Sequence, residues 1–330
     1  MGLGADLDCR RAHRVVDGVL LAQSLARYFE ARPVMNGSSR NQAWVAAMPW
    51  VFVLIWSTGF IVARYGMPHS PPFTFLWWRY AFSILCLLAW MGLARVAWPT
   101  NRAQWMHLAV TGVLMHAGYL GGVWAAVKAG MGSGLSALIV GLQPVLTAIW
   151  LSSRGGHVSR RQWLGLLFGF LGLALVVARK FEHGVEVNAW SLSMAVMALC
   201  CITVGTLYQK RFVTPCDVRS ANAVQLLAAC VVTLPFAWAE TEQAVWVPEA
   251  MWAMAWSVLG LTVGASSLLY ILIQRGAATA VTSLMYLVPP TTAVMAWCLF
   301  DEPITWVTVA GVALTAMGVS LVVRPPRIAG

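Results

Sequence analysis

The chain has 330 residues, of which 59% are hydrophobic and only 10% are charged. A soluble domain carries about 25% charged residues, so this composition excludes a soluble globular protein, and its hydrophobicity excludes a disordered chain. The net charge of +10 does not indicate nucleic-acid binding, because the basic residues stand in short clusters between apolar stretches and not on one solvated face. Composition therefore predicts a polytopic integral membrane protein.

The first 43 residues are polar and charged, with one apolar stretch, Val15–Leu25, that is too short to cross a membrane. Asp6 and Asp8 argue against a signal peptide, and no small-residue cleavage site follows the stretch. We expect residues 1–43 to form a cytoplasmic tail, either disordered or lying as a helix on the membrane surface. A start of translation at Met35 is a third reading.

Ten apolar runs follow, each close to the ~20 residues that a helix needs to cross ~30 Å of hydrocarbon. They are longer than the ~10-residue alternating segments of a membrane β-barrel, so these runs predict an all-α integral membrane fold. The predicted spans are Trp44–Arg64, Phe73–Leu93, Trp105–Val127, Gly132–Leu151, Gln162–Ala178, Ala189–Tyr208, Ser220–Trp238, Ala250–Ile273, Ala278–Phe300 and Trp306–Val323.

Lys and Arg in the flanks predict the orientation of these spans. If the N-terminus is cytoplasmic, most of the 22 basic residues lie on the cytoplasmic side, as the positive-inside rule requires. The sequence therefore predicts a multi-pass protein of the inner or plasma membrane, with both termini in the cytoplasm.

The two halves of the chain are related by a shift of 146 residues. The shift takes Gly59 to Gly205 and Pro144 to Pro290, and it pairs other glycines in the same way, namely Gly118 with Gly264, Gly165 with Gly311 and Gly172 with Gly318. Each half, 44–179 and 189–324, holds five predicted spans. Because five is odd, the second half enters the membrane from the opposite face, which predicts two inverted five-helix repeats. Transporters commonly have this architecture, and some channels share it.

Four short motifs carry a resemblance to a known family: Trp56-Ser57-Thr58-Gly59-Phe60, Leu76-Trp77-Trp78-Arg79-Tyr80, Leu287-Val288-Pro289-Pro290 and Asp301-Glu302-Pro303-Ile304. With these motifs the chain resembles the EamA-like ten-helix group of the drug/metabolite transporter superfamily over residues 44–324. The resemblance implies transport of small organic solutes, often exported metabolites or amino-acid derivatives. The family often has Gly-Glu before its fifth and tenth helices, whereas this chain has Gly155-Gly156-His157 before the fifth.

The paired prolines are the strongest physical indication of a site. Each lies near the middle of its predicted span, where a proline frees the backbone carbonyl four residues earlier. Such a carbonyl must face protein or a wet cavity; the alternative is a simple packing kink. Small polar and aromatic side chains nearby suit a partly apolar solute. The candidate substrate-binding residues are Trp56, Tyr119, Trp124, Gln143, Pro144, Tyr270, Tyr286, Pro290 and Thr291.

Two further side chains inside the spans are ionisable. Arg79 is a candidate for binding an anionic substrate, or else a structural charge. His116 is a possible proton site, or else a neutral, hydrogen-bonded histidine. Gly165-x-x-x-Gly169 is typical of close helix packing.

The leading interpretation is a secondary transporter, most simply an exporter, that alternates access to a midplane cavity. A passive channel is the alternative. An intramembrane enzyme is disfavoured, since no nucleophile with a base and no cluster of metal ligands occurs at membrane depth. We expect no metal, cofactor or nucleic-acid partner; the expected partners are a small-molecule substrate, the lipid bilayer and, as an open option, a second copy of the chain. Facilitated diffusion, exchange and a proton route through His116 all remain open.

Overall fold

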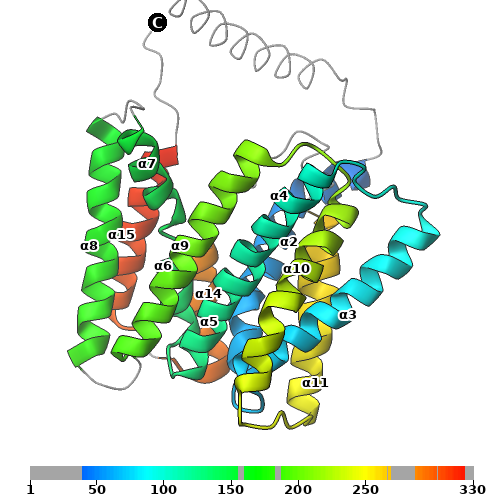
Figure 1. The fold of residues 1–330 in the computed structure, drawn as a ribbon. Helices are drawn as coiled ribbons and strands as arrows, with labels where there is room; N and C mark the ends of the chain where they lie inside the picture. The colour runs from blue at the N-terminus through cyan, green and yellow to red at the C-terminus, as the bar shows by residue number, and fades with distance from the viewer. Residues whose placement is uncertain are drawn as a thin grey trace, which may run out of the picture. The chain divides into compact units, whose positions relative to one another are not determined.

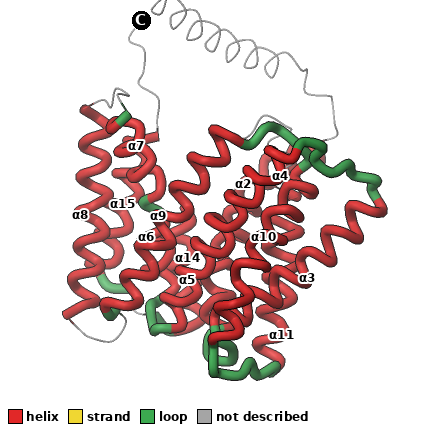
Figure 2. The backbone as a smooth tube through the Cα atoms, in the orientation of Figure 1, coloured by secondary structure: helices red, strands yellow, loops and turns green. Residues whose placement is uncertain are grey.

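The computed structural model describes residues 39–154, 160–182, 187–265, 267–268, 287–302 and 304–323. The chain divides into two units, Met1–Ala47 and Met48–Gly330, and of the first only the residues that begin helix α2 are described. Within these ranges the regular structure is helical throughout, as the long apolar runs predict (Figures 1 and 2). The elements are α2 (Ser39–Gly66), α3 (Pro72–Leu93), α4 (Arg102–Gly112), the π-helix η1 (Val113–Gly118), α5 (Tyr119–Lys128), α6 (Ser133–Val140), α7 (Gln143–Ser153), α8 (Arg160–Glu182), α9 (Ala189–Phe212), α10 (Val218–Ala239), α11 (Pro248–Ala255), the π-helix η2 (Trp256–Ala265), α14 (Val288–Phe300) and α15 (Trp306–Val323).

Six helical stretches among the described residues are long and apolar enough to cross a membrane. They are Pro72–Leu93, Arg102–Lys128, Ser133–Trp150, Arg160–Ala178, Ala189–Phe212 and Val218–Ala239. Three shorter apolar helices, Trp50–Gly66, Val288–Phe300 and Trp306–Leu321, fall in the first, ninth and tenth predicted spans. The start of the ninth span lies outside the described residues.

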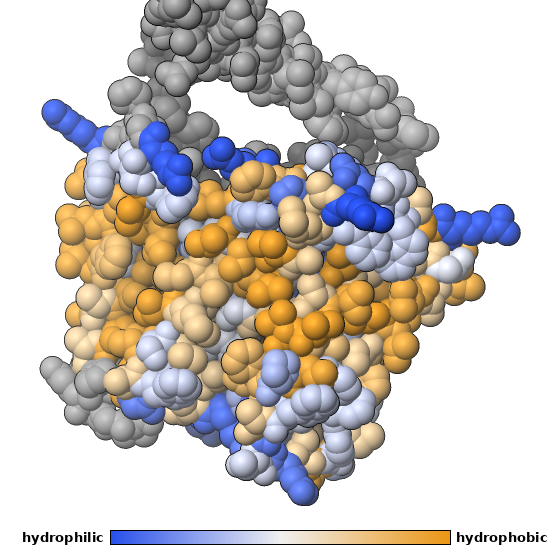
Figure 3. All heavy atoms as spheres, viewed as in Figure 1, coloured by the Kyte–Doolittle hydropathy of each residue, from blue (hydrophilic) through white to orange (hydrophobic). Residues whose placement is uncertain are grey.

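The outward faces of these helices are apolar. Leu85 on α3 is 63% exposed and Val231 on α10 is 64% exposed, and many other large hydrophobic side chains are also exposed. Figure 3 shows apolar side chains over the middle of the visible face, with hydrophilic residues gathered towards its two ends. Exposed apolar surface on this scale is unfavourable in water, but it is the surface that a helix presents to lipid.

The third and fourth predicted spans are not continuous α-helices. In the third, the π-helix η1 separates α4 from α5. In the fourth, the helix is interrupted at Gly141 and Leu142, between α6 and α7. Pro144 is the second residue of α7, and its ring nitrogen cannot donate a hydrogen bond to the carbonyl of Val140. The interruption therefore lies within one turn before the proline.

A second π-helix, η2, follows α11. Its wider turn is visible in one side-chain contact: the hydroxyl of Thr262 donates to the carbonyl of Ser257, five residues earlier, over 3.0 Å. In the α-helical part of the third span, the hydroxyl of Thr111 donates to His107, four residues earlier. Apolar periodicity does not distinguish these two helix types, so the sequence did not predict either π-helix.

Glycines bring α8 and α15 into close contact, and the two helices lie side by side in Figure 1. A methyl group added to Gly172 would lie only 2.5 Å from the carbonyl oxygen of Gly311. One added to Gly318 would collide with the backbone of Gly165 and Gly169. The close-packing role predicted for Gly165 and Gly169 is therefore confirmed, with α15 as the neighbouring helix.

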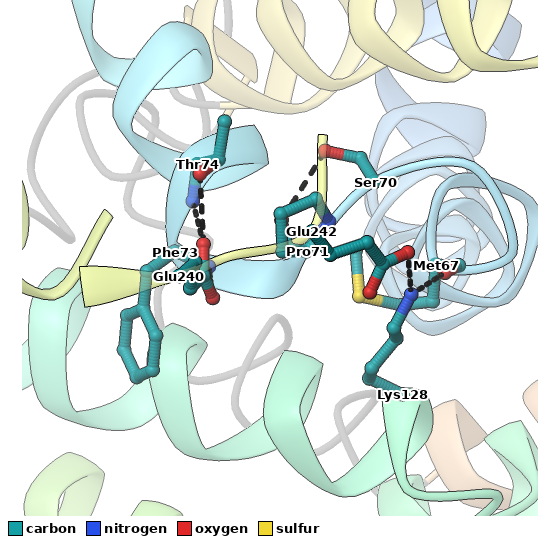
Figure 4. A network of polar contacts seen from close by, with 8 residues as sticks. All are labelled: Met67, Ser70, Pro71, Phe73, Thr74, Lys128, Glu240 and Glu242. Carbon is teal, nitrogen blue, oxygen red and sulfur yellow. Dashed lines mark hydrogen bonds and ion pairs between the residues drawn. The ribbon is translucent and has the colours of Figure 1, made fainter. Parts of the chain in front are cut away.

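The segment after α10 packs along the segment between α2 and α3 (Figure 4). The carboxylate of Glu240 accepts hydrogen bonds from the backbone N–H groups of Phe73 (2.9 Å) and Thr74 (2.7 Å). These belong to the first turn of α3, whose N–H groups have no partner within the helix. Nearby, Lys128 at the end of α5 forms an ion pair with Glu242 and donates to the carbonyl of Met67.

Glu302, the acid before the tenth predicted span, has a comparable structural role. It is 9% exposed, and its carboxylate accepts a hydrogen bond from the backbone N–H of Ser133 over 3.0 Å. Ser133 is the first residue of α6, so a charge from the second half of the chain stabilises the start of a helix in the first half.

Candidate functional site

A cavity with a volume of about 130 Å³ lies between helices of both halves of the chain. Its walls come from α2, α3, η1 and α5 of the first half and from α9, α10 and η2 of the second. The residues that line it are Trp56, Gly59, Phe60, Arg79, Met115, His116, Tyr119, Leu120, Val123, Trp124, Ile202, Asn222, Leu226, Leu261 and Thr262.

Both π-helices contribute to the cavity wall. Met115 and His116 come from η1, and Leu261 and Thr262 come from η2. A π-helical turn widens the helix locally and is common at functional sites. In η1 the carbonyl of His116 accepts a hydrogen bond from the hydroxyl of Tyr80, over 2.9 Å. Tyr80 is buried on α3, so this bond ties the π-helix to the helix that carries Arg79.

Arg79 is the basic side chain of the cavity wall. It is 7% exposed, and no hydrogen bond or ion pair joins it to any residue that the structure describes; its Nε atom is buried without a partner. The guanidinium carbon lies 6.0 Å from the ring centroid of Trp124. That ring is itself held in place by stacking on Phe75, at 4.7 Å between centroids.

The rest of the wall is apolar and aromatic, with a few polar groups. Asn222 and Thr262 supply polar atoms from the second half, and His116 and Tyr119 supply them from the first. None of the lining residues is acidic. A mainly apolar cavity with a few convergent polar groups is the usual form of a small-molecule site, and this one carries a basic side chain.

The structure brings five of the sequence-predicted residues together. Trp56, Tyr119 and Trp124, proposed as substrate contacts, line the same cavity as the two ionisable candidates, Arg79 and His116. They come from three predicted spans, and their proximity could not be read from spacing along the chain.

The residues beside the paired prolines do not line this cavity. Gln143 donates from Nε2 to the hydroxyl of Thr206 on α9, over 2.8 Å. Pro290 lines a separate void of about 20 Å³ together with Gly141 and Pro289, which is room for about one water molecule. Pro144 and Thr291 are half-buried on α7 and α14. Tyr270 and Tyr286 lie outside the described residues.

Sequence reasoning did not select the second-half residues of the wall, Ile202, Asn222, Leu226, Leu261 and Thr262. One signal was present: Asn222 is a polar amide within the predicted span Ser220–Trp238, and polar residues inside spans usually face the bundle interior. The aliphatic members carry no comparable signal, because apolar side chains face lipid and cavity alike.

Comparison with known proteins agrees with this architecture. The model of the EamA-like transporter family matches residues 44–178 and 189–324. An uncharacterized transporter of Archaeoglobus fulgidus is 23% identical over 275 residues, which is 82% of this chain and 93% of that protein. The uncharacterized transporter YvbV of Bacillus subtilis is 25% identical over 82% of this chain and 88% of its own length.

Two further matches extend the comparison. A Salmonella typhimurium protein named "Probable amino-acid metabolite efflux pump" is 22% identical over 60% of this chain and 63% of its own length. A solved crystal structure superposes with a TM-score of 0.58 at 16% identity, covering 84% of this chain and 97% of that one; this likeness concerns the fold alone. With the family model matched in both halves, the chain is a multi-pass membrane protein that belongs to the EamA-like transporter family.

Proposed function

We propose that this protein is a secondary transporter that exports a small organic metabolite by alternating access to the cavity beside Arg79. The observation that carries the proposal is the shared construction of the cavity. Trp56, Arg79 and Tyr119 come from the first family repeat, and Asn222 and Thr262 come from the second. A cavity between two halves can open to one side or the other when the halves rock against each other.

The proposed architecture is ten spans in two inverted five-helix repeats, and the glycine contacts support it. The 146-residue shift pairs Gly165 with Gly311 and Gly172 with Gly318, yet Gly172 meets Gly311 and Gly318 meets Gly165. Reciprocal contacts of this kind are characteristic of a two-fold axis. An axis in the membrane plane would relate two halves of opposite orientation.

The π-helices give independent support. The shift carries η1 onto residues of η2 and α3 onto residues of α10. In agreement with a two-fold axis, η1 packs on α10 while η2 packs on α3, and α3 packs on α10. An irregular helix is an unfavourable element, so its presence at matching places in both halves favours a shared role in the pathway.

Both termini are proposed to lie in the cytoplasm, and cysteine labelling tests this. In a variant whose seven native cysteines are replaced by serine, Glu242→Cys should react with a membrane-impermeant reagent from outside. Arg102→Cys should react only from inside. Both residues are exposed at helix ends or in loops. Reaction of both from the same side would rule out the inverted arrangement.

The proposed substrate class is an amino-acid derivative or a related metabolite, in line with the name of the Salmonella relative. The test is flux through the purified full chain in liposomes, over a panel of amino acids, nucleosides, sugars and cationic drugs. Saturable flux with exchange of labelled for unlabelled solute supports a transporter. Flux that rises linearly with concentration would instead support the passive channel.

His116 is the proposed proton site, since it lines the cavity and its imidazole has a ring nitrogen that can accept and release a proton. If transport is coupled to protons, an imposed pH gradient should drive accumulation in the wild type and not in His116→Gln. Equal accumulation by both proteins would exclude this route and leave exchange or facilitated diffusion.

A further inference from the structure

We propose that the cavity selects organic anions: the guanidinium of Arg79 binds a carboxylate, while the aromatic wall contacts the apolar part of the same molecule. This inference names the substrate class of the cavity and rests on the proposed transport function.

Arg79 has no counter-charge among the residues that the structure describes. The described acidic residues all lie at helix ends or in loops, and none lines the cavity: Glu182, Asp217, Glu240, Glu242, Glu249, Asp301 and Glu302. A charge inside a bilayer normally pairs with another group, and burial without a partner is strongly unfavourable. A protein that keeps such a charge exposed to a cavity has a ready site for an anion.

The surroundings of the guanidinium leave its N–H donors available to a ligand. The ring of Trp124, 6.0 Å from the guanidinium carbon, provides a cation–π contact, which compensates only part of the desolvation of a buried cation. It occupies none of the guanidinium's N–H donors. A carboxylate can accept two of these donors at once in the forked geometry that arginine favours.

The remaining wall of the cavity is mainly apolar. Trp56, Phe60 and Tyr119 are aromatic, and Leu261 on η2 is aliphatic. The volume of about 130 Å³ is comparable to the ~150 Å³ apolar cavity that holds a benzene ring in another protein. Together these features fit a small acid with one apolar ring or branched chain, more closely than a sugar or a nucleotide.

The test compares phenylacetate with phenylacetamide, which has the same ring but no charge. Binding to the purified full chain in detergent is followed by thermal unfolding and by intrinsic tryptophan fluorescence. Phenylacetate should raise the midpoint of unfolding, because a ligand that binds only the folded state stabilises it, and phenylacetamide should not. In Arg79→Gln, phenylacetate affinity should fall by about 10- to 100-fold, as expected for loss of hydrogen bonds to a charged group.

Three comparisons separate binding from a structural role. Without ligand, Arg79→Gln should unfold no earlier than the wild type, because the substitution removes an uncompensated buried charge. Arg79→Lys, which keeps the charge without the planar fork, should bind with intermediate affinity. Arg102→Gln, which removes an exposed arginine at the start of α4, should bind phenylacetate like the wild type.

Several results would overturn the inference. They are an equal response to phenylacetamide, an equal response to chloride or inorganic phosphate at the same concentration, and early unfolding of Arg79→Gln with its anion preference unchanged. The flux panel, with phenylacetate added to it, distinguishes this failure from that of the proposed function. Saturable flux of neutral or cationic solutes only would refute the anion site and leave the transport function standing. Anion binding without any flux would refute the transport function and leave the anion site standing.

Discussion

Glu240 and Thr74 are 166 residues apart in the chain and are joined by two hydrogen bonds: the carboxylate accepts both the backbone N–H of Thr74, at 2.7 Å, and its hydroxyl, at 2.8 Å. A negative charge from the second half of the chain thus occupies the N-terminal end of α3, the helix that carries Arg79. The start of α10 is capped differently. There the carboxylate of Asp217, the residue just before the helix, accepts a hydrogen bond from the backbone N–H of Arg219.

The first prediction concerns this contact between the halves. Glu240→Ala should destabilise the protein by about 0.5–2 kcal/mol, the usual cost of losing a helix N-terminal cap. Glu240→Gln should cost less, because its amide oxygen still accepts a hydrogen bond. Thermal unfolding in detergent measures both. Glu249→Ala, at the exposed start of α11, is the control. An equal loss in Glu249→Ala would mean that the hydrogen bonds of Glu240 add nothing beyond the general effect of an acid at the start of a helix.

The second prediction concerns the contact between α8 and α15. Gly172→Leu should destabilise the protein by at least ~1–3 kcal/mol, as overpacking generally does, because a side chain there meets the backbone of Gly311. Gly92 on α3 has open space where a Cβ would lie, so Gly92→Leu should change stability by less than about 0.5 kcal/mol. The amount of monodisperse protein extracted from the membrane is the measurement. Comparable yields from the two variants would contradict the packing argument.

The third prediction concerns pH. The Arg219 guanidinium, hydrogen-bonded to Asp217, holds the pKa of that carboxyl below its usual value of 3.8. A lowered folded-state pKa stabilises the protein above the pKa of the unfolded state, and this contribution is lost as the pH falls through the folded-state value. Asp217→Asn, which keeps a good capping side chain, should therefore be less stable than the wild type at pH 7. The difference should shrink as the pH falls below about 4. A difference that is constant with pH would exclude the ion pair as its cause.

The fourth prediction distinguishes two candidate substrate-binding sites, the cavity beside Arg79 and the region of the paired prolines. The sequence predicts that Gln143 and Thr291 contact it, whereas Gln143 bonds Thr206 and lies away from the cavity. We expect Gln143→Ala and Thr206→Val to lower stability equally and to leave the apparent affinity for transported solute unchanged. Asn222→Ala should weaken that affinity about two- to tenfold, for one hydrogen bond lost. A fall in affinity in Gln143→Ala but not in Thr206→Val would place the substrate-binding site beside the paired prolines.

Much of the fold could be predicted from the sequence, because a bilayer imposes length and composition on every helix that crosses it. The apolar runs located α2, α3, α8, α9 and α10 to within a few residues. Pro144 predicted the interruption of the fourth span, since the loss of a backbone donor is a local effect. The π-helices could not be predicted in this way, because a widened turn leaves the apolar pattern almost unchanged.

The sequence by itself determined that the protein is helical and membrane-embedded, and that Trp56, Arg79, His116, Tyr119 and Trp124 merit attention as polar or aromatic groups in apolar spans. Only the tertiary structure decided that these five side chains share one cavity, and that Gln143 bonds Thr206 instead. The physical reason is that hydrophobicity specifies which segments enter the bilayer, but every helix in lipid has an apolar exterior. Which faces meet is decided by close packing at residues such as Gly172 and Gly311 and by long-range contacts such as that of Glu240 with Thr74.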